Sequence, residues 1–361
     1  MKPFFVVGTR PEIIKMAPII HEFEKREINP YLLHTGQHYS NSLSSQFFKD
    51  MSLKNPDENL NIGSGTHSEQ TAKALVGIEK ALLKEKPDVV LVQGDTNAVL
   101  SAALASVKLG IPVGHVEAGL RSYDIRMPEE HNRRLTDHIS SYLFAPTEKT
   151  ANNLRTEKVW GEIFVTGNTV IDALEDRVAL IKGKKSLAAD MGLKNFALLT
   201  MHRAENVDDQ KILTGLIEGL LALDSDIIFS AHPRTISRLK ESNLLSRVQK
   251  EKHMHIIEPP GYLEFLALMR DCEFILTDSG GIQEEATAPS INKRVFVLRT
   301  STERPEAEKS GHATLVGVDP KVFVGKIKNA VSEGLDAPRN CPYGDGHAAQ
   351  KIVDILLETK K

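Results

Sequence analysis

The sequence predicts an α/β protein built from two doubly wound, Rossmann-like domains. Short apolar runs alternate with longer segments of helical periodicity along almost the whole chain, as parallel sheets require. A length of 361 residues favours two domains. A solvated Lys-Gly-Lys-Lys stretch at residues 182–185 lies between two such alternating series. We therefore expect a first domain over residues 1–182 and a second over 183–343.

The elements of the first domain follow from these patterns. Pro11 suits the start of a helix, where its missing N–H costs nothing, and apolar residues then recur at helical spacing through Phe23. Residues 50–66 look irregular. We expect strands at 4–7, 31–34, 88–92, 113–116, 142–145 and 163–166, and helices at 12–25, 42–49, 67–84, 98–109, 129–141, from 147 onward and at 170–182.

The second domain repeats the alternation. We expect strands at 196–200, 227–230, 255–257, 274–277, 295–298 and 314–316, with helices between them. A last helix over residues 346–358 has no strand after it. We therefore predict that residues 344–361 cross back to pack on the first domain.

Composition narrows the classes of function. The net charge is −3 and no long Lys/Arg block occurs, so neither nucleic acid nor a membrane surface is an expected partner. The N-terminal apolar run is too short for a signal peptide, and no run approaches about 18 residues. We expect a cytoplasmic protein. Cys272 and Cys341 fit no Cys-x-x-Cys pattern, so we expect free thiols and neither a structural zinc nor a disulfide framework.

Residues 273–285 suggest a nucleotide site. An apolar run leads into Asp278-Ser279-Gly280-Gly281, which predicts a strand, a tight turn and a helix N-terminus. Adjacent glycines let a diphosphate approach the backbone N–H groups. Glu284 and Glu285 would lie in the first helical turn, and a carboxylate there could accept the hydroxyls of a ribose. The alternative, a turn and a capped helix without a ligand, is about as good when this stretch is considered alone.

Other polar clusters also follow predicted strands. Arg10, Asp95, Glu117 and His202 stand at strand ends, where doubly wound domains bind ligands, and we expect them to line a cleft between the two domains. Asp95, Glu117 and the Glu129-Glu130 pair are candidate acids and bases. For residues 129–134 a salt-bridged helix start competes with that interpretation. The run at residues 302–306 supplies Arg304 near the nucleotide, or is a rim loop.

Absent motifs exclude some chemistry. No Gly-x4-Gly-Lys-Ser/Thr sequence occurs, which excludes a P-loop enzyme. Gly344-x-Gly346-x-x-Ala349 resembles a dinucleotide fingerprint, but no strand precedes it. With neither an NAD site nor a metal triad, we expect the reaction to proceed by proton transfer and departure of a leaving group.

Six blocks of sequence together resemble the non-hydrolysing UDP-N-acetylglucosamine 2-epimerases. They occur in the family's order across nearly the whole chain, at residues 8–15, 93–96, 114–121, 166–172, 278–285 and 303–306. The resemblance implies a glycosyltransferase-B-like fold, a homodimer, and interconversion of UDP-GlcNAc and UDP-ManNAc for glycan precursor supply. UDP would be eliminated to give 2-acetamidoglucal and then added back, with no NAD and no metal.

The resemblance also assigns residues. It places Asp95, Glu117, Glu129 and Arg133 around the sugar, with the three carboxylates as acid/base candidates, and Lys15 at the active-site end of the first domain. A second UDP-GlcNAc activates some members near positions matching Gln37, His38 and His232, although Ser40 replaces a Gln found in those members. For the nucleotide it implies Ser279, Gly280 and Gly281 at the diphosphate, Glu285 at the ribose, Phe265 at the uracil, and Arg10, His202 and Arg304 in contact, with His202 also assisting the departure of UDP.

Three alternatives remain open on the sequence. A hydrolysing epimerase of the same fold would release free ManNAc and UDP, and a glycosyltransferase would transfer the sugar to an acceptor. A catalytically silent nucleotide-sugar sensor would keep residues 279–285 but would not need the carboxylates.

Overall fold

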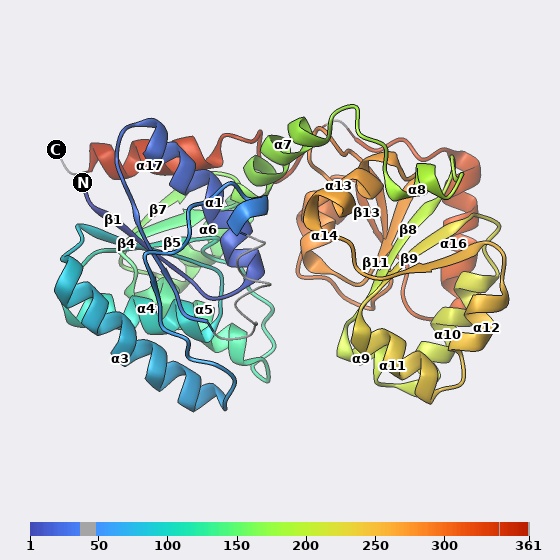
Figure 1. Cartoon of the computed structure of the whole chain (residues 1–361), viewed down its shortest axis with the longest axis horizontal. Coiled ribbons are helices and arrows are strands. Elements are labelled where there is room, and N and C mark those ends of the chain that lie inside the picture. Colours follow the sequence, from blue (N-terminus) through green and yellow to red (C-terminus); the bar gives the residue numbers. More distant parts are fainter. Residues whose placement is uncertain (37–47, 339, 360–361) are drawn as a thin grey trace. The chain divides into compact units, whose positions relative to one another are not determined.

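The structure is a computed structural model, and it describes residues 1–36, 48–338 and 340–359 (Figure 1). The chain divides into two compact units. Unit 1 comprises Met1–Ala173 and Tyr343–Lys361, and unit 2 comprises Leu174–Pro342. Each unit is a parallel β-sheet with helices, so the predicted α/β class is confirmed.

Unit 1 contains a seven-stranded sheet in the order β3-β2-β1-β4-β5-β6-β7, and every pairing is parallel. Its strands β1 and β4 are fully buried apolar runs, as expected of central strands covered on both faces. The strands are β1 (Pro3–Val7), β2 (Tyr31–His34), β3 (Glu58–Asn59), β4 (Val89–Gln93), β5 (Val113–Val116), β6 (Tyr142–Ala145) and β7 (Glu162–Val165). The helices are α1 (Arg10–Lys25), α3 (His67–Glu85), α4 (Asn97–Lys108), α5 (Pro128–Ile139), α6 (Glu148–Glu157), α7 (Thr169–Ile181), which continues into unit 2, and α17 (Ala348–Glu358).

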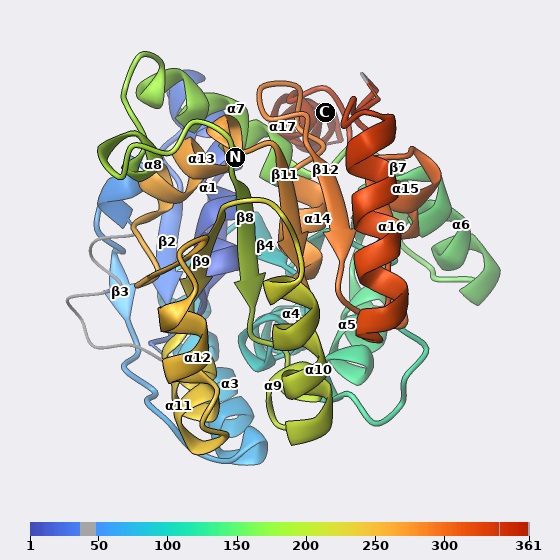
Figure 2. The same cartoon turned by 90° about the vertical axis from the view of Figure 1, so that its right-hand side faces the viewer.

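Unit 2 contains a six-stranded parallel sheet in the order β10-β9-β8-β11-β12-β13. Figure 2 looks onto the face of this sheet that helices α10, α12 and α16 cover, where Leu199, Phe229 and Phe296 pack against Leu216 and Phe323. The strands are β8 (Ala197–Met201), β9 (Ile227–Ala231), β10 (Met254–Ile257), β11 (Phe274–Thr277), β12 (Arg294–Val297) and β13 (Ala313–Leu315). The helices are α8 (Leu187–Asp190), α9 (Ala204–Val207), α10 (Gln210–Leu221), α11 (Pro233–Glu241), α12 (Leu245–Lys250), α13 (Tyr262–Asp271), α14 (Gly280–Glu285), α15 (Pro305–Lys309) and α16 (Pro320–Glu333).

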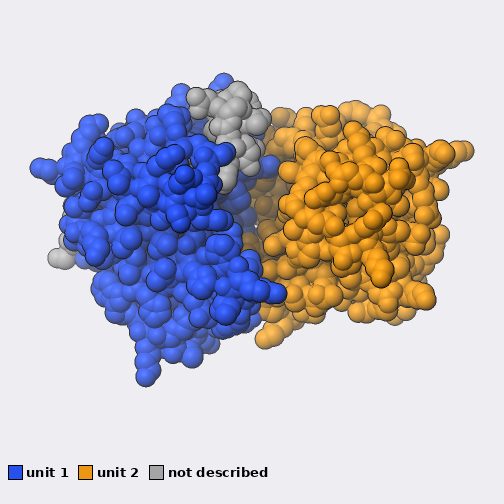
Figure 3. Space-filling model, turned by 90° about the horizontal axis from the view of Figure 1, so that it is seen from below, with its two compact units in different colours: residues 1–173, 343–361 blue, residues 174–342 orange. Residues whose placement is uncertain are grey.

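The C-terminal segment packs on unit 1, beside α1 (Figures 1 and 3). The backbone N–H of Ala349 donates to Asp172 Oδ1 at 2.8 Å, and that of Asn168 donates to the Tyr343 carbonyl at 2.8 Å. Arg26 of α1 and Asp354 of α17 form an ion pair at 2.6 Å. Helix α17 therefore closes a side of unit 1 although it follows all of unit 2 in sequence.

Three element predictions need comment. The expected irregular stretch 50–66 contains the two-residue strand β3. Glu and Asn are uncommon in strands, so its sequence did not predict it, and the strand arises from its pairing with β2. Most of the expected helix at 42–49 lies outside the described residues. The remaining predicted elements occur, and their ends agree with the prediction or are shifted by at most two residues. Cys272 is buried and Cys341 is partly buried, and no disulfide bond joins them in the described part of the chain. In the described part of the chain, no helix is both long and apolar enough to cross a membrane.

The strand orders define one ligand-binding position in each unit. In unit 1 the chain direction across the sheet reverses between β1 and β4, and in unit 2 it reverses between β8 and β11. In open α/β sheets, ligands bind beyond the carboxyl ends of the two strands at such a switch point. The loops that follow these four strands hold Asp95, His202 and Ser279, and Arg10 and Gly280 start the helices after β1 and β11.

Candidate active site

The first switch-point loop in unit 1 connects β1 to α1 and is organised by Glu12. Its Oε2 accepts a hydrogen bond from the Gly8 N–H at 2.6 Å, and its Oε1 accepts one from the Thr9 hydroxyl at 3.0 Å. Glu12 is buried, and burial, partly opposed by the hydrogen bonds from Gly8 and from the hydroxyls of Thr96 and Thr9, raises its pKa to about 7. Sequence reasoning missed this residue. The Thr9-x-x-Glu12 spacing of a capping box was the available signal.

Glu117 and Lys15 form a buried ion pair. Lys15 Nζ lies 2.6 Å from Glu117 Oε2, and the Gln93 side-chain amide donates to the same oxygen. Glu117 has a φ of 70°, a left-handed conformation that is uncommon outside glycine and is found at functional sites. The N–H groups of Glu117 and Ala118 both donate to the Phe144 carbonyl at 3.1 Å, which holds the loop in this conformation. The structure thus places together three predicted positions from the ends of β1, β4 and β5.

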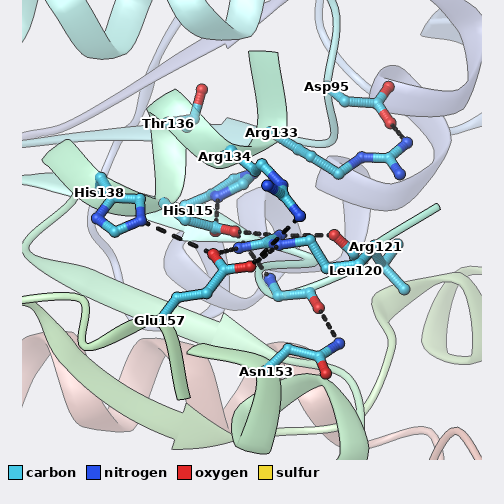
Figure 4. Close-up of polar contacts among 12 residues, drawn as sticks. Asp95, His115, Leu120, Arg121, Arg133, Arg134, Thr136, His138, Asn153 and Glu157 are labelled. Atoms are coloured by element: carbon cyan, nitrogen blue, oxygen red, sulfur yellow. Dashed lines mark hydrogen bonds and ion pairs between the residues drawn. The ribbon is translucent and has the colours of Figure 1, made fainter. Parts of the chain in front are cut away.

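Asp95 pairs with Arg133, as Figure 4 shows. Helix α5 approaches the Asp95 loop at two points, because the neighbouring Asn132 amide donates to the Asp95 carbonyl at 3.0 Å. The Asp95 side chain keeps 30% of its surface exposed, so a ligand can reach it. Two predicted sugar-site residues are therefore in direct contact, with the carboxylate still accessible.

The two adjacent glutamates of α5 have different surroundings. Glu130 is buried and accepts hydrogen bonds from the N–H and hydroxyl of Ser122, and it pairs with Arg133 at 2.9 Å and Arg134 at 3.1 Å. Burial alone would raise its pKa, but the Ser122 bonds and Arg133 hold that pKa below its ordinary value. Glu130 therefore builds the salt-bridged helix start that the sequence offered as an alternative. Glu129, the predicted acid/base residue, is partly exposed, and no hydrogen bond or ion pair connects it to another described residue.

In unit 2 the switch-point loops are joined by Asp278. This fully buried carboxylate accepts hydrogen bonds from the backbone N–H groups of His202 at 3.0 Å and Arg203 at 2.9 Å, and from the Asn206 amide at 3.1 Å. The loops after β8 and β11 are thereby fixed to each other. The first residue of the Asp-Ser-Gly-Gly motif is structural, and it leaves the following residues available for a ligand.

Helix α14 begins at Gly280, with Ser279 as its N-cap. The Ser279 side chain makes no capping hydrogen bond, and a Cβ built on Gly281 would meet only Ser279 Oγ, at 3.9 Å. A Cβ on Gly280 would lie 3.8 Å from the Arg203 guanidinium, 3.9 Å from Glu303 Oε2 and 4.0 Å from the Arg304 guanidinium, and Glu303 is itself paired with Arg299 at 2.8 Å. The backbone N–H groups at this helix start are therefore accompanied by two cations, which suits an anion.

The prediction that Glu284 and Glu285 lie in the first turn of this helix is wrong. The helix starts at Gly280, so both fall in its last turn. Glu284 is buried and paired with Arg304, while Glu285 is partly exposed. The prediction placed the two glycines in a turn before the helix, whereas they are the first two residues of the helix.

The other predicted nucleotide contacts lie on unit 2 or near the β1 end. His202 Nδ1 lies 3.3 Å from Asp278 Oδ1. The imidazole is 44% exposed, and its pKa is lowered because partial desolvation and the charge of Arg203 outweigh the attraction of Asp278. Phe265 lies in the first turn of α13, partly exposed, and Arg10 starts α1. His232 is the exposed N-cap of α11. Gln37 and His38 lie outside the described residues.

Comparison with known proteins connects these sites to a family. A family model described as UDP-N-acetylglucosamine 2-epimerase matches residues 21–357. The chain belongs to this family. It is 50% identical over 371 aligned positions to UDP-N-acetylglucosamine 2-epimerase of Methanocaldococcus jannaschii, covering all of both chains. It is 36% identical to UDP-2,3-diacetamido-2,3-dideoxy-D-glucuronate 2-epimerase of Pseudomonas aeruginosa, covering 99% of this chain and all of the relative.

A solved structure supports the same family and fold. The M. jannaschii UDP-GlcNAc 2-epimerase in complex with UDP-GlcNAc and UDP superposes with a TM-score of 0.86 at 50% identity, over 99% of this chain and all of the other. The glycosyltransferase-B-like fold class and the resemblance of the six sequence blocks are thereby confirmed.

The raised pKa of Glu12 predicts a specific pH dependence of stability. Because the folded-state pKa of about 7 lies above the ordinary value of 4.5, the folded protein binds this proton more tightly than the unfolded chain. Stability from this group is therefore complete below about pH 4.5 and is lost as the pH rises towards 7. Relative to Glu12→Gln, the wild type should lose about 3 kcal/mol over this range.

Urea denaturation from pH 4.5 to 8 measures this difference. Glu79→Gln, at an exposed position of α3, is the matched control and should run parallel to the wild type. If the Glu12→Gln curve also runs parallel to the wild type, Glu12 is ionised throughout and the assignment is wrong.

Proposed function

We propose that this protein is a non-hydrolysing UDP-N-acetylglucosamine 2-epimerase, an isomerase that interconverts UDP-GlcNAc and UDP-ManNAc. The observation that carries the proposal is the pairing of two carboxylates with two cations at neighbouring strand ends, Glu117 with Lys15 and Asp95 with Arg133, in a chain of this family. Inversion at a carbon needs one group to remove a proton and another to return it on the opposite face.

The reaction balances without an external oxidant. A base takes the C2 proton, the C1–C2 double bond forms, and the C1–O bond breaks with its electron pair leaving on UDP, which gives 2-acetamidoglucal. In the second half of the reaction, C2 of the glucal is protonated on the opposite face and the UDP oxygen attacks C1. Since C2 is not next to a carbonyl, coupling proton loss to departure of UDP replaces carbonyl activation. We therefore propose that neither NAD nor a metal ion is required.

Unit 1 supplies the proposed proton-transfer groups. Asp95 and Glu117 are our first candidates, because the two carboxylates follow the neighbouring strands β4 and β5 and each is held in position by a cation. Glu129 remains the third candidate, on the family resemblance alone. Arg133 would hold Asp95 in position while its charge attracts the anionic substrate.

Unit 2 supplies the proposed nucleotide groups. The helix start at Ser279, Gly280 and Gly281 would bind the diphosphate together with Arg304, and the lowered pKa of His202 leaves a neutral imidazole able to donate one hydrogen bond to it. Glu285 is proposed for the ribose and Phe265 for the uracil. Charge developing on the departing UDP would be stabilised by these fixed donors.

The decisive experiment is proton NMR of UDP-GlcNAc with purified protein in deuterated water, with EDTA and without added NAD. Appearance of UDP-ManNAc carrying deuterium at C2 is the expected result. Accumulation of UDP and free ManNAc would replace the proposal with the hydrolysing reaction. No change in UDP-GlcNAc, with conversion of the UDP-2,3-diacetamido glucuronate instead, would assign the substrate named for the P. aeruginosa relative.

Asp95→Asn tests the assignment of a base. The substitution keeps the shape of the side chain but removes its basicity, so turnover should fall by at least about 100-fold while the affinity for UDP stays within about twofold. Isothermal titration with UDP and the NMR assay measure the two quantities. Asp354→Asn, at the exposed ion pair between α17 and α1, is the control. Normal turnover of Asp95→Asn would exclude Asp95 as an acid/base group.

We also propose a homodimer in the cytoplasm that supplies precursors for glycans. The dimer is supported by exposed apolar side chains of unit 1: Val76 and Leu83 are 50% and 56% exposed, and two turns apart on the same face of α3, and Leu135 of α5 is 53% exposed. Light scattering should give about twice the 39.9 kDa chain mass for the wild type. Val76→Asp combined with Leu83→Asp should give the monomer, whereas Val322→Asp, at an exposed position of α16, should not. A monomeric wild type would contradict the proposal.

A further inference from the structure

A buried network of four charged or titratable side chains lies behind the carboxylates of unit 1. His115 of β5, Asp137 of α5 and Arg121 are each less than a tenth exposed, and Glu157 ends α6. Figure 4 shows Arg121 directed towards Glu157. None of the four is in the proposed proton-transfer set.

His115 bridges two acceptors. Its Nδ1 lies 2.7 Å from Asp137 Oδ1, and its Nε2 lies 2.8 Å from the Gly94 carbonyl oxygen. A carbonyl oxygen can only accept, so Nε2 carries a proton. The bond at Nδ1 then needs a second proton, held either by the imidazole or by Asp137.

The surroundings of Asp137 decide where that second proton lies. Its Oδ2 accepts from the Arg121 guanidinium at 2.7 Å and from the Gly119 N–H at 3.2 Å. Burial opposes the charge on Arg121, yet its bonds to Glu157 and its attraction to Asp137 raise its pKa. A permanent cation and an N–H donor both favour an ionised carboxylate. His115 is therefore an imidazolium, and the network of His115, Asp137, Arg121 and Glu157 is neutral overall.

The network reaches both candidate proton-transfer loops. Gly94, whose carbonyl binds His115, immediately precedes Asp95 and has a φ of 85°. Gly119, whose N–H binds Asp137, follows Glu117 by two residues and has a φ of 82°. A Cβ on Gly119 would lie 2.3 Å from the Thr150 carbonyl oxygen, so this loop has no room to move towards α6.

Helix α5 also contacts Asp95 and its loop directly. Asp137 lies one turn after Arg133, which holds the Asp95 carboxylate, and Asn132 holds the Asp95 carbonyl. Helix α5 thus contacts the Asp95 loop through Arg133 and Asn132. Its Asp137 also accepts from the Gly119 N–H of the Glu117 loop, and His115 of β5 connects Asp137 to the Gly94 carbonyl of the Asp95 loop.

We propose that His115 and Asp137 are positioning residues for the epimerisation, a buried imidazolium–carboxylate pair that fixes the separation of Asp95 and Glu117. This inference rests on the proposed function for its kinetic consequence, but not for its protonation state. Two acid/base groups acting on opposite faces of one carbon need a fixed separation, and a misplacement of about 1 Å costs about 100-fold in rate.

The protonation state has its own measurement. Enzyme labelled with ¹⁵N-histidine contains 13 His residues, and the signals lost in His115→Gln identify the ring of interest. At pH 7.5 we expect proton-bearing signals from both ring nitrogens of His115. One protonated and one bare nitrogen would overturn the imidazolium, whether or not the protein epimerises UDP-GlcNAc. If His115→Gln does not fold, Asp137→Asn identifies the ring by the shift of its Nδ1 signal.

The kinetic test uses His115→Gln and Asp137→Asn, with rates normalised to the UDP-binding sites measured by titration. We expect kcat to fall about 100-fold while KM for UDP-GlcNAc stays within about threefold, because positioning of the carboxylates is lost and nucleotide binding is not. His255→Gln breaks a partly exposed His–Asp pair in unit 2, with Nε2 3.3 Å from Asp226, and should leave both constants unchanged.

Each outcome of the kinetic test has a separate meaning. Fewer binding sites with an unchanged kcat per site would show that the pair only stabilises the fold, and would overturn the positioning role. A wild type that binds UDP but is inactive would contradict the proposed function. The protonation state of His115 would then be tested by the NMR experiment alone.

Discussion

The unit 1 site depends on one constraint: a carboxylate buried away from water must be matched by a cation or by enough donors. Glu117 is matched by Lys15 and Gln93, and Asp137 by His115 and Arg121, while the partly exposed Asp95 is paired with Arg133. Removing one member of such a buried pair costs several kcal/mol, on the order of 3–5, because the other charge is left uncompensated. Each pair joins elements distant in sequence, so matching the charges also fixes the loops that carry them.

Unit 2 meets the same constraint with dipoles. Asp278 is as buried as Asp137, but its donors are two backbone N–H groups and an amide, and its ring contact with His202 is longer, at 3.3 Å. Asp278 therefore needs no cation as its main partner. The guanidinium groups of Arg203 and of Arg304, which is paired with Glu284, lie near Gly280, where the diphosphate is proposed to bind. The difference between the units follows their proposed tasks, proton transfer in one and anion binding in the other.

The sequence predicted the sheets well and the partners of the site residues poorly. Parallel strands buried on both faces read as continuous apolar runs, so β6 and β11 were predicted with their true ends. The strand-end placement of Asp95 and Glu117 followed from that. Pairings such as Lys15 with Glu117, 102 residues apart, depend on strand order, which periodicity does not contain. Periodicity also did not show that Glu130, and not its neighbour Glu129, is the buried member of the pair, because successive residues of a helix point about 100° apart and tertiary contacts decide which one is buried.

Glu12 and Glu117 are two buried carboxyl groups that differ in whether a cation lies beside them. Both are buried glutamates at the ends of adjoining loops of unit 1, but Glu117 has Lys15 one turn after Glu12 on α1. The partners of Glu12 among the described residues are the Gly8 N–H and the hydroxyls of Thr9 and Thr96, and Asp95 adds a repelling charge. Neutral donors do not offset burial, so Glu12 exchanges its proton near neutral pH, whereas the Glu117 carboxylate lies against the Lys15 ammonium. A carboxyl that need never touch the substrate thus titrates near neutral pH beside the proposed base Asp95.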